Sequence, residues 1–189
     1  MGRRLKFEQA AAVDRAVDLL WGQGYSGTTP VDLVNELGLG KGSLYRSFDS
    51  KHNLFSLAPR RYSAERLESL AEGLEDDGPM RPKLKAAAAR LTGVGLHERG
   101  CFRVNSIAEL GHADESVTQA AAELFDGIES DFKVSVESGQ ATGEFGTGGS
   151  PEGIARALLV TVVGISALVK SGTDPARLSR ILDTAIESL

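Results

Sequence analysis

The sequence predicts an all-α protein of about nine helices, with a small N-terminal three-helix head and a larger C-terminal helical body. Apolar residues recur at helical spacing through most of the 189 residues, and neither a strand-like alternation nor an internal repeat occurs. The interruptions fall at glycine and proline clusters, which separate helices. We expect the head to comprise residues 1–50 and the body residues 51–189.

The head is predicted to contain three helices. An amphipathic segment at residues 7–23 precedes Gly24, a suitable C-terminal stop. Two short segments follow at residues 31–37 and 41–48, on either side of a GLG turn. Thr28 and Thr29 are good N-cap residues for the first of them, and Pro30 stands where a helix tolerates proline best. This pattern indicates a helix-turn-helix.

The second short segment has an unusual balance of side chains. Only Leu44 and Phe48 are available to anchor it, whereas the other large side chains are polar. A helix that keeps most of its side chains outward suits the recognition helix of a helix-turn-helix, which lies in the major groove of DNA. Two short helices around a glycine turn also occur in many enzymes, so the pattern alone leaves both readings open.

Charge distribution favours nucleic acid as the partner of the head. The whole chain carries a net charge of −5, but residues 1–61 hold nine Lys/Arg against six Asp/Glu. Residues 62–189 hold twelve against twenty. A basic end on an acidic body is typical of a protein that binds nucleic acid at one end.

Composition excludes several other classes. The single cysteine, Cys101, forbids an intramolecular disulfide, and the N-terminus lacks the apolar core of a secretory signal, so we expect a cytoplasmic protein. The apolar run at residues 155–169 is too short, and too interrupted by Thr161, Gly164 and Ser166, to be expected to span a membrane. The three histidines lack metal-ligand spacing, and no phosphate loop or nucleophile motif occurs. We therefore expect no catalytic residues, no metal site, no cofactor and no enzymatic activity.

The body is predicted to contain six helices. They are expected at residues 51–74, 80–96, 101–110, 115–138, 151–171 and 175–189. Proline at position 59 lacks the N–H that a helix interior requires, which predicts a kink or break between residues 55 and 60. A break there would give two pieces, 51–57 and from 60 onward, and would provide a hinge between head and body.

The helix expected at residues 151–171 is apolar nearly all round between residues 157 and 169. Such a helix must be covered on more than one side. It could lie at the centre of its own bundle, or it could form a four-helix interface with the last helix and the same two helices of a second copy. A two-fold dimer would carry two recognition helices and would require a roughly palindromic operator.

The head resembles the tetracycline-repressor (TetR) family of transcription regulators. The resemblance covers residues 10–55 and is carried by AVDRAVDLLWGQGY, SGTTP and DLVNELGLGKGSLYRSFDSKHNLF. It implies a homodimeric repressor, and it implies that Lys41, Ser43 and Arg46 face base edges while Gly42 lets the helix approach the DNA backbone. Thr29, Tyr45 and Lys51 would contact phosphates. Pro30 replaces a residue that helps readout in some relatives.

The body segments GCFRVNSIAELGHADESV and LFDGIESDFKVSVESGQATGEF resemble one branch of the same family. The resemblance implies a small-molecule effector, which is reactive for some relatives with a cysteine near this position. The mostly apolar residues expected to line the pocket suit a hydrophobic effector. Cys101 at a helix start could sense electrophiles, or could simply pack as a small apolar residue. The expected ligand-binding residues are Leu91, Cys101, Phe102, Asn105, Phe125, Ile128, Phe132 and Val162, a set that also describes an ordinary core. The alternative is a helical small-molecule-binding or enzyme-like protein whose head docks on protein.

Overall fold

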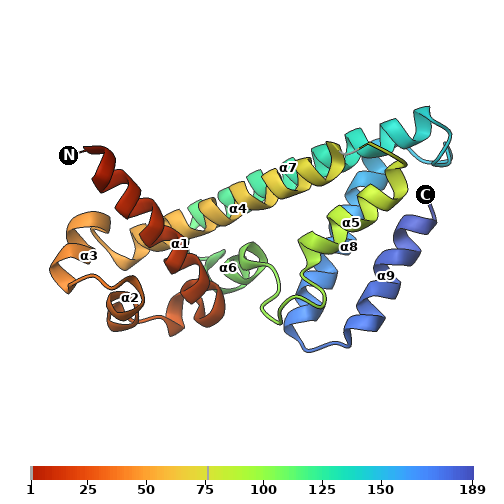
Figure 1. Cartoon of the computed structure of the whole chain (residues 1–189). Helices are drawn as coiled ribbons and strands as arrows, with labels where there is room; N and C mark the ends of the chain where they lie inside the picture. The colour runs from red at the N-terminus through yellow and green to blue at the C-terminus, as the bar shows by residue number, and fades with distance from the viewer. Residues whose placement is uncertain (1, 76) are drawn as a thin grey trace. The chain divides into compact units, whose positions relative to one another are not determined.

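The computed structural model describes the backbone of residues 2–75 and 77–189 and, within these, the side chains from residue 10 onward. The described chain is all-α, as predicted (Figure 1). Its helices are α1 (Gly2–Gly27), α2 (Pro30–Leu37), α3 (Lys41–Phe48), α4 (Lys51–Glu75), α5 (Met80–Thr92), α6 (Phe102–Leu110), α7 (Glu115–Ala141), α8 (Pro151–Lys170) and α9 (Pro175–Glu187).

The chain forms two compact units. The first comprises the described residues up to Ala64 together with Asn105–Ala120, and the second comprises the described residues of Glu65–Val104 and of Ala121–Leu189. In the first unit, α2 packs against both α1 and α3, and in the second, α5, α8 and α9 pack against one another. The first unit therefore contains the helix-turn-helix and also part of α6 and the first residues of α7. The domain boundary at residue 50 stays a prediction.

Each unit has its own apolar core, built from residues at helical spacing. The first core includes Ala16, Leu20, Leu33, Leu37, Phe55 and Tyr62. The second includes Leu84, Phe132, Val136, Leu158, Val162, Leu178 and Leu182. Because both cores form within a unit, the helix-turn-helix is held by side chains of its own neighbourhood.

The predicted break at Pro59 is wrong. Helix α4 runs without interruption from Lys51 to Glu75, with Pro59 in its interior (Figure 1). Proline in a helix interior costs about 3 kcal/mol, so other contacts must hold the helical path. Phe55 and Ala58 before the proline and Tyr62 after it are all buried, and their packing provides that stabilisation. A kink of the continuous helix at Pro59, and the hinge inferred from it, stay predictions.

Several other helix ends differ from the predictions by a few residues, and α1 begins at Gly2 rather than at residue 7. The regular path of α1 does stop at Gly24, which has φ 76° and ψ 174°, but helical residues continue to Gly27. Helix α5 ends at Thr92 rather than at residue 96, because Gly93 adopts the left-handed conformation with φ 69°. Helix α7 continues to Ala141, and the amide of Phe145 donates to the carbonyl of Gly139 at 3.0 Å.

Candidate nucleic-acid interface

The start of α2 is fixed by a capping box. The amide of Asp32 donates to Oγ1 of Thr29 at 3.2 Å, and the amide of Thr29 donates to Oδ2 of Asp32 at 2.7 Å. The hydroxyl of Thr29 also donates to Oδ2 of Asp32 at 2.7 Å, and this bond, together with the one from the Thr29 amide, lowers the pKa of Asp32, so the carboxylate is charged at neutral pH. Pro30 occupies the first turn, where its missing N–H costs nothing. The predicted N-cap at Thr29 is confirmed.

The turn between α2 and α3 depends on Gly38. This residue has φ 63° and ψ 27°, a conformation that glycine adopts without strain. Its amide donates to the carbonyl of Asn35 at 3.4 Å, and the amide of Leu39 donates to that of Val34 at 3.3 Å. These bonds satisfy carbonyls at the end of α2, while Leu33 and Leu37 bury its inner face.

Helix α3 has the side-chain distribution that the sequence predicted. Leu44 is 4% exposed and Phe48 is 3% exposed, and every other residue of α3 is exposed. The exposed set includes five of the predicted DNA-contacting residues, which share one helix of eight residues. They are Lys41, Gly42, Ser43, Tyr45 and Arg46. At Gly42 a Cβ atom would meet nothing within 4 Å, so the backbone itself lies at an open surface.

The two remaining predicted contact residues lie outside α3. Thr29 is exposed at the start of α2. Lys51, at the start of α4, is only half-exposed, and its ammonium group makes contacts within the protein. Its Nζ donates to the carbonyl oxygen of Thr28 at 2.7 Å and lies 4.0 Å from the centre of the Tyr25 ring. Lys51 therefore braces the segment before α2.

Sequence reasoning missed two carboxylates of the first unit, Glu109 in α6 and Asp114 before α7. Glu109 accepts backbone hydrogen bonds from Tyr25 and Ser26, and Asp114 lies beside His52. Their partners are more than 60 residues away in the sequence, so no local pattern could have identified them. Both contacts join the 105–120 segment to the helix-turn-helix region within one compact unit.

The predicted effector-binding residues divide by exposure. Leu91, Phe102, Ile128, Phe132 and Val162 are buried. Cys101, Asn105 and Phe125 are half-exposed, and Asn105 belongs to the first unit whereas the others belong to the second. A hollow of about 520 Å³ in the second unit, formed by residues 146–149, α8 and α9, is lined by none of the eight. A second hollow of about 480 Å³ near the start of α5 is not lined by them either.

No group of three or more His, Cys, Asp and Glu residues is placed to hold a metal ion in the part of the chain that the structure describes. The polar residues of α3 instead offer hydrogen-bond donors and positive charge on an exposed helix surface. This arrangement suits a nucleic-acid partner, and it defines a helix-turn-helix DNA-binding protein with an all-α second unit.

Comparison with known proteins agrees with this class. Residues 12–58 match the family described as bacterial regulatory proteins, tetR family, and residues 82–185 match the tetracyclin repressor-like C-terminal domain. The second match alone covers more than half of the chain. The chain thus belongs to the TetR family of transcription regulators.

Individual relatives cover the chain almost completely. An uncharacterised HTH-type transcriptional regulator of Bacillus subtilis, YezE, is 25% identical over 195 residues, which is 100% of each chain. The structure of the regulator CifR, a cysteine mutant complexed with 26-bp operator DNA, is 22% identical and has a TM-score of 0.75 over 94% of each chain. FadR of Bacillus subtilis in complex with stearoyl-CoA is 15% identical, with a TM-score of 0.73 over 94% of this chain and 97% of that one.

Proposed function

We propose that this protein is a cytoplasmic homodimeric repressor that binds a roughly palindromic operator and leaves it when a small molecule binds the body. The observation that carries the proposal is α3, in which two buried side chains anchor the helix and all the others are exposed. The operator complex of CifR, a protein of the same fold, supports DNA as the partner. The function is one of binding, without a catalytic step.

The exposed side chains of α3 have the chemistry for sequence readout. Arg46 would hydrogen-bond a guanine through both arms of its guanidinium group, and Lys41 and Ser43 would contact neighbouring bases. Thr29, Tyr45 and Lys51 would contact phosphates and set the register. Because one ammonium donor of Lys51 already bonds Thr28, a phosphate would share this side chain with the internal brace.

Operator binding tests these roles. Fluorescence anisotropy with duplexes from the region upstream of the protein's own gene should show sequence-specific binding by the wild type. Arg46→Ala should weaken specific binding by about 1–3 kcal/mol and relax the base preference at one position. Arg60→Ala is the matched control, because Arg60 is exposed on α4 outside the recognition helix. Equal effects of both variants on operator and random DNA would reject base readout by Arg46.

We infer that α8 and α9 form the dimer interface. Val160 is 70% exposed and Leu168 is 41% exposed on α8, where Ala157 and Gly164 continue the same exposed stripe at helical spacing. Ile181 on α9 is 39% exposed. No charged side chain interrupts the α8 stripe between Ala157 and Leu168, so a second copy could cover it closely.

The length and apolar composition of α8 would also suit a membrane span, and 33% of its most apolar stretch is buried in the described chain. The helix is longer than the apolar run noted in the sequence. It lies inside the match to the C-terminal domain of the regulator family, which favours a second protein chain as its cover.

Sedimentation equilibrium tests the interface. Leu168→Glu combined with Ile181→Glu should produce monomers that no longer bind the operator, because charge would enter an apolar contact. Leu96→Glu is the control, since Leu96 is 71% exposed in the loop after α5. A wild-type monomer at micromolar concentration would refute the dimer.

The proposed effector is a hydrophobic or reactive small molecule. Stearoyl-CoA bound to FadR supports a lipophilic ligand for a body of this fold. Cys101 is a free, half-exposed thiol next to the start of α6, which supports a reactive one. A thermal-shift screen of lipophilic drugs, acyl thioesters and aldehydes should identify candidates. N-ethylmaleimide should release the wild type from DNA and leave Cys101→Ser bound; equal behaviour of the two proteins would remove the thiol from the mechanism.

A further inference from the structure

The last residues of α1 are held by a carboxylate from α6. At Gly24 the chain leaves helical geometry, with φ 76° and ψ 174°. The amide of Tyr25 donates to Oε2 of Glu109 at 2.8 Å, and the amide of Ser26 donates to Oε1 at 2.6 Å. Each carboxylate oxygen thus accepts one backbone N–H, and the two bonds fix the backbone of this corner.

The hydrogen bonds of the corner continue to the start of α2. The hydroxyl of Thr28 donates to the carbonyl of Gly24 at 2.7 Å, and Lys51 donates to the carbonyl of Thr28 at 2.7 Å. Thr28 itself is buried, and the next residue, Thr29, is the N-cap of α2. Glu109 is therefore connected through a short run of satisfied polar groups to the first residue of the helix-turn-helix.

Glu109 is charged at neutral pH. Partial burial would raise the pKa of its carboxyl group, but hydrogen bonds from Ser26 and Tyr25 and the positive charge of Lys51 hold that pKa below its usual value. Charge-assisted hydrogen bonds of this kind are stronger than bonds between neutral groups. Replacement by glutamine would retain the shape of the side chain but leave one acceptor oxygen, so one bond to the corner would lose its charge and the other would be lost.

Close approach at this corner depends on glycine. A Cβ atom on Gly24 would lie 2.9 Å from Oε2 of Glu109, and the positive φ of Gly24 disfavours any other residue. The absence of a side chain at position 24 lets the carboxylate reach the two amides. Gly24 thus provides the space that the side chain of Glu109 occupies, although the two residues are far apart in the sequence.

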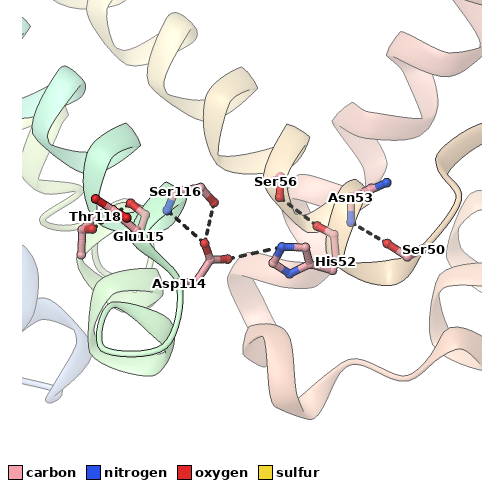
Figure 2. A network of polar contacts seen from close by, with 8 residues as sticks. All are labelled: Ser50, His52, Asn53, Ser56, Asp114, Glu115, Ser116 and Thr118. Carbon is pink, nitrogen blue, oxygen red and sulfur yellow. Dashed lines mark hydrogen bonds and ion pairs between the residues drawn. The ribbon is translucent and has the colours of Figure 1, made fainter.

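A second carboxylate of the same segment contacts α4 independently. Oδ1 of Asp114 accepts from the amide of Ser116 at 3.0 Å and from its hydroxyl at 2.6 Å (Figure 2). Oδ2 is buried without a hydrogen bond and lies 3.4 Å from Nε2 of His52, in the first turn of α4. The hydrogen bonds of Ser116 and the charge of a protonated His52 lower the pKa of Asp114, although burial opposes them. Two separate contacts thus join residues 105–120 to the helix-turn-helix region.

We propose that Glu109 is a positioning residue for operator binding, because it orders the corner from which α2 starts and thereby fixes how Thr29 and α3 are presented to DNA. The inference rests on the proposed function, because it assigns to α6 a part in operator affinity.

The test compares two isosteric variants of the full-length protein. Glu109→Gln removes the charge at the corner, whereas Glu115→Gln removes an exposed charge from the first turn of α7 and is the matched control. Operator affinity is measured by anisotropy at several salt concentrations, and amide hydrogen exchange is followed by NMR. Glu109→Gln should weaken operator binding at least tenfold, since two charge-assisted bonds are lost. It should also lose exchange protection at Tyr25 and Ser26, and Glu115→Gln should do neither.

Hydrogen exchange separates positioning from simple stabilisation. The buried amides of Leu33 and Leu37 should stay protected in Glu109→Gln, because the core of the head does not include Glu109. Loss of protection at these residues as well would make Glu109 a residue that only stabilises the fold, and would overturn the proposal. Unchanged affinity in Glu109→Gln, or an equal loss in Glu115→Gln, would overturn it too.

A double-mutant cycle adds a check from the other side of the contact. Gly24→Ala should weaken operator binding strongly in the wild type and less in Glu109→Ala, where the collision with the carboxylate is absent. Additive effects would reject the contact between positions 24 and 109. Failure of the wild type to bind any sequence would instead reject the proposed function itself, so the two failures are distinguishable.

Discussion

Leu44→Ala should detach the recognition helix while the second unit stays folded. Helix α3 has eight residues, and isolated helices of this length are not stable in water. Its stability depends on Leu44 and Phe48, the two side chains that it buries. Loss of a buried leucine side chain costs about 2–5 kcal/mol, against a typical domain stability of about 5–15 kcal/mol. Half of the anchoring of α3 would therefore disappear, and the helix should fray at temperatures where the rest of the chain is native.

The assay combines operator anisotropy with amide exchange along α3. In Leu44→Ala, the amides of Tyr45 and Phe48 should exchange faster, and operator affinity should fall at least tenfold at 25 °C, which corresponds to about 1.4 kcal/mol. Leu84→Ala is the matched control, because it removes the same atoms from a fully buried position in α5 of the second unit. It should lower the thermal midpoint without this local fraying. Wild-type operator affinity in Leu44→Ala would refute the reasoning, as would an equal affinity loss in the control.

Further predictions concern strain, protonation and close packing. Asp49 has φ 59° at the end of α3, so Asp49→Gly should raise the free energy of unfolding by about 1 kcal/mol in urea titrations, and no gain would show that the site is unstrained. Burial and two neighbouring guanidinium groups lower the pKa of His97, so the folded state favours the neutral imidazole. The resulting stabilisation of the fold is complete above about pH 6.5, the ordinary pKa of histidine, and is lost as the pH falls. The wild type should therefore lose more stability between pH 7 and pH 5 than His97→Gln, and equal losses would contradict this. Gly100 has φ 66°, and a Cβ there would lie 2.6 Å from a backbone oxygen of α8, so Gly100→Ala should destabilise more than Gly95→Ala, where φ is 74° and the space is open. Equal destabilisation would show that the backbone angle alone decides the cost.

The sequence by itself determined the helix-turn-helix. The cap at Thr29, the left-handed Gly38 and the bounds of α3 are all encoded by residues within a few positions of the structure they specify. The two anchors of α3 follow from the same local pattern, because a helix of known register has a defined inner face. For these reasons the exposed set on α3 could be predicted before any tertiary contact was known.

Only the tertiary structure decided how this motif is held. The local sequence at Pro59 predicts a break in α4. Burial of the neighbouring side chains keeps the helix continuous, because packing energy can exceed the cost of a lost hydrogen bond. The local sequence predicts that Lys51 is available to DNA phosphates, but in the structure its ammonium group donates to the backbone carbonyl of Thr28. The carboxylate of Glu109 meets the amide of Tyr25 across 84 residues of sequence. Helical periodicity reports which face of a helix is buried, whereas the partner of each polar group depends on how distant segments pack, and no local pattern encodes that.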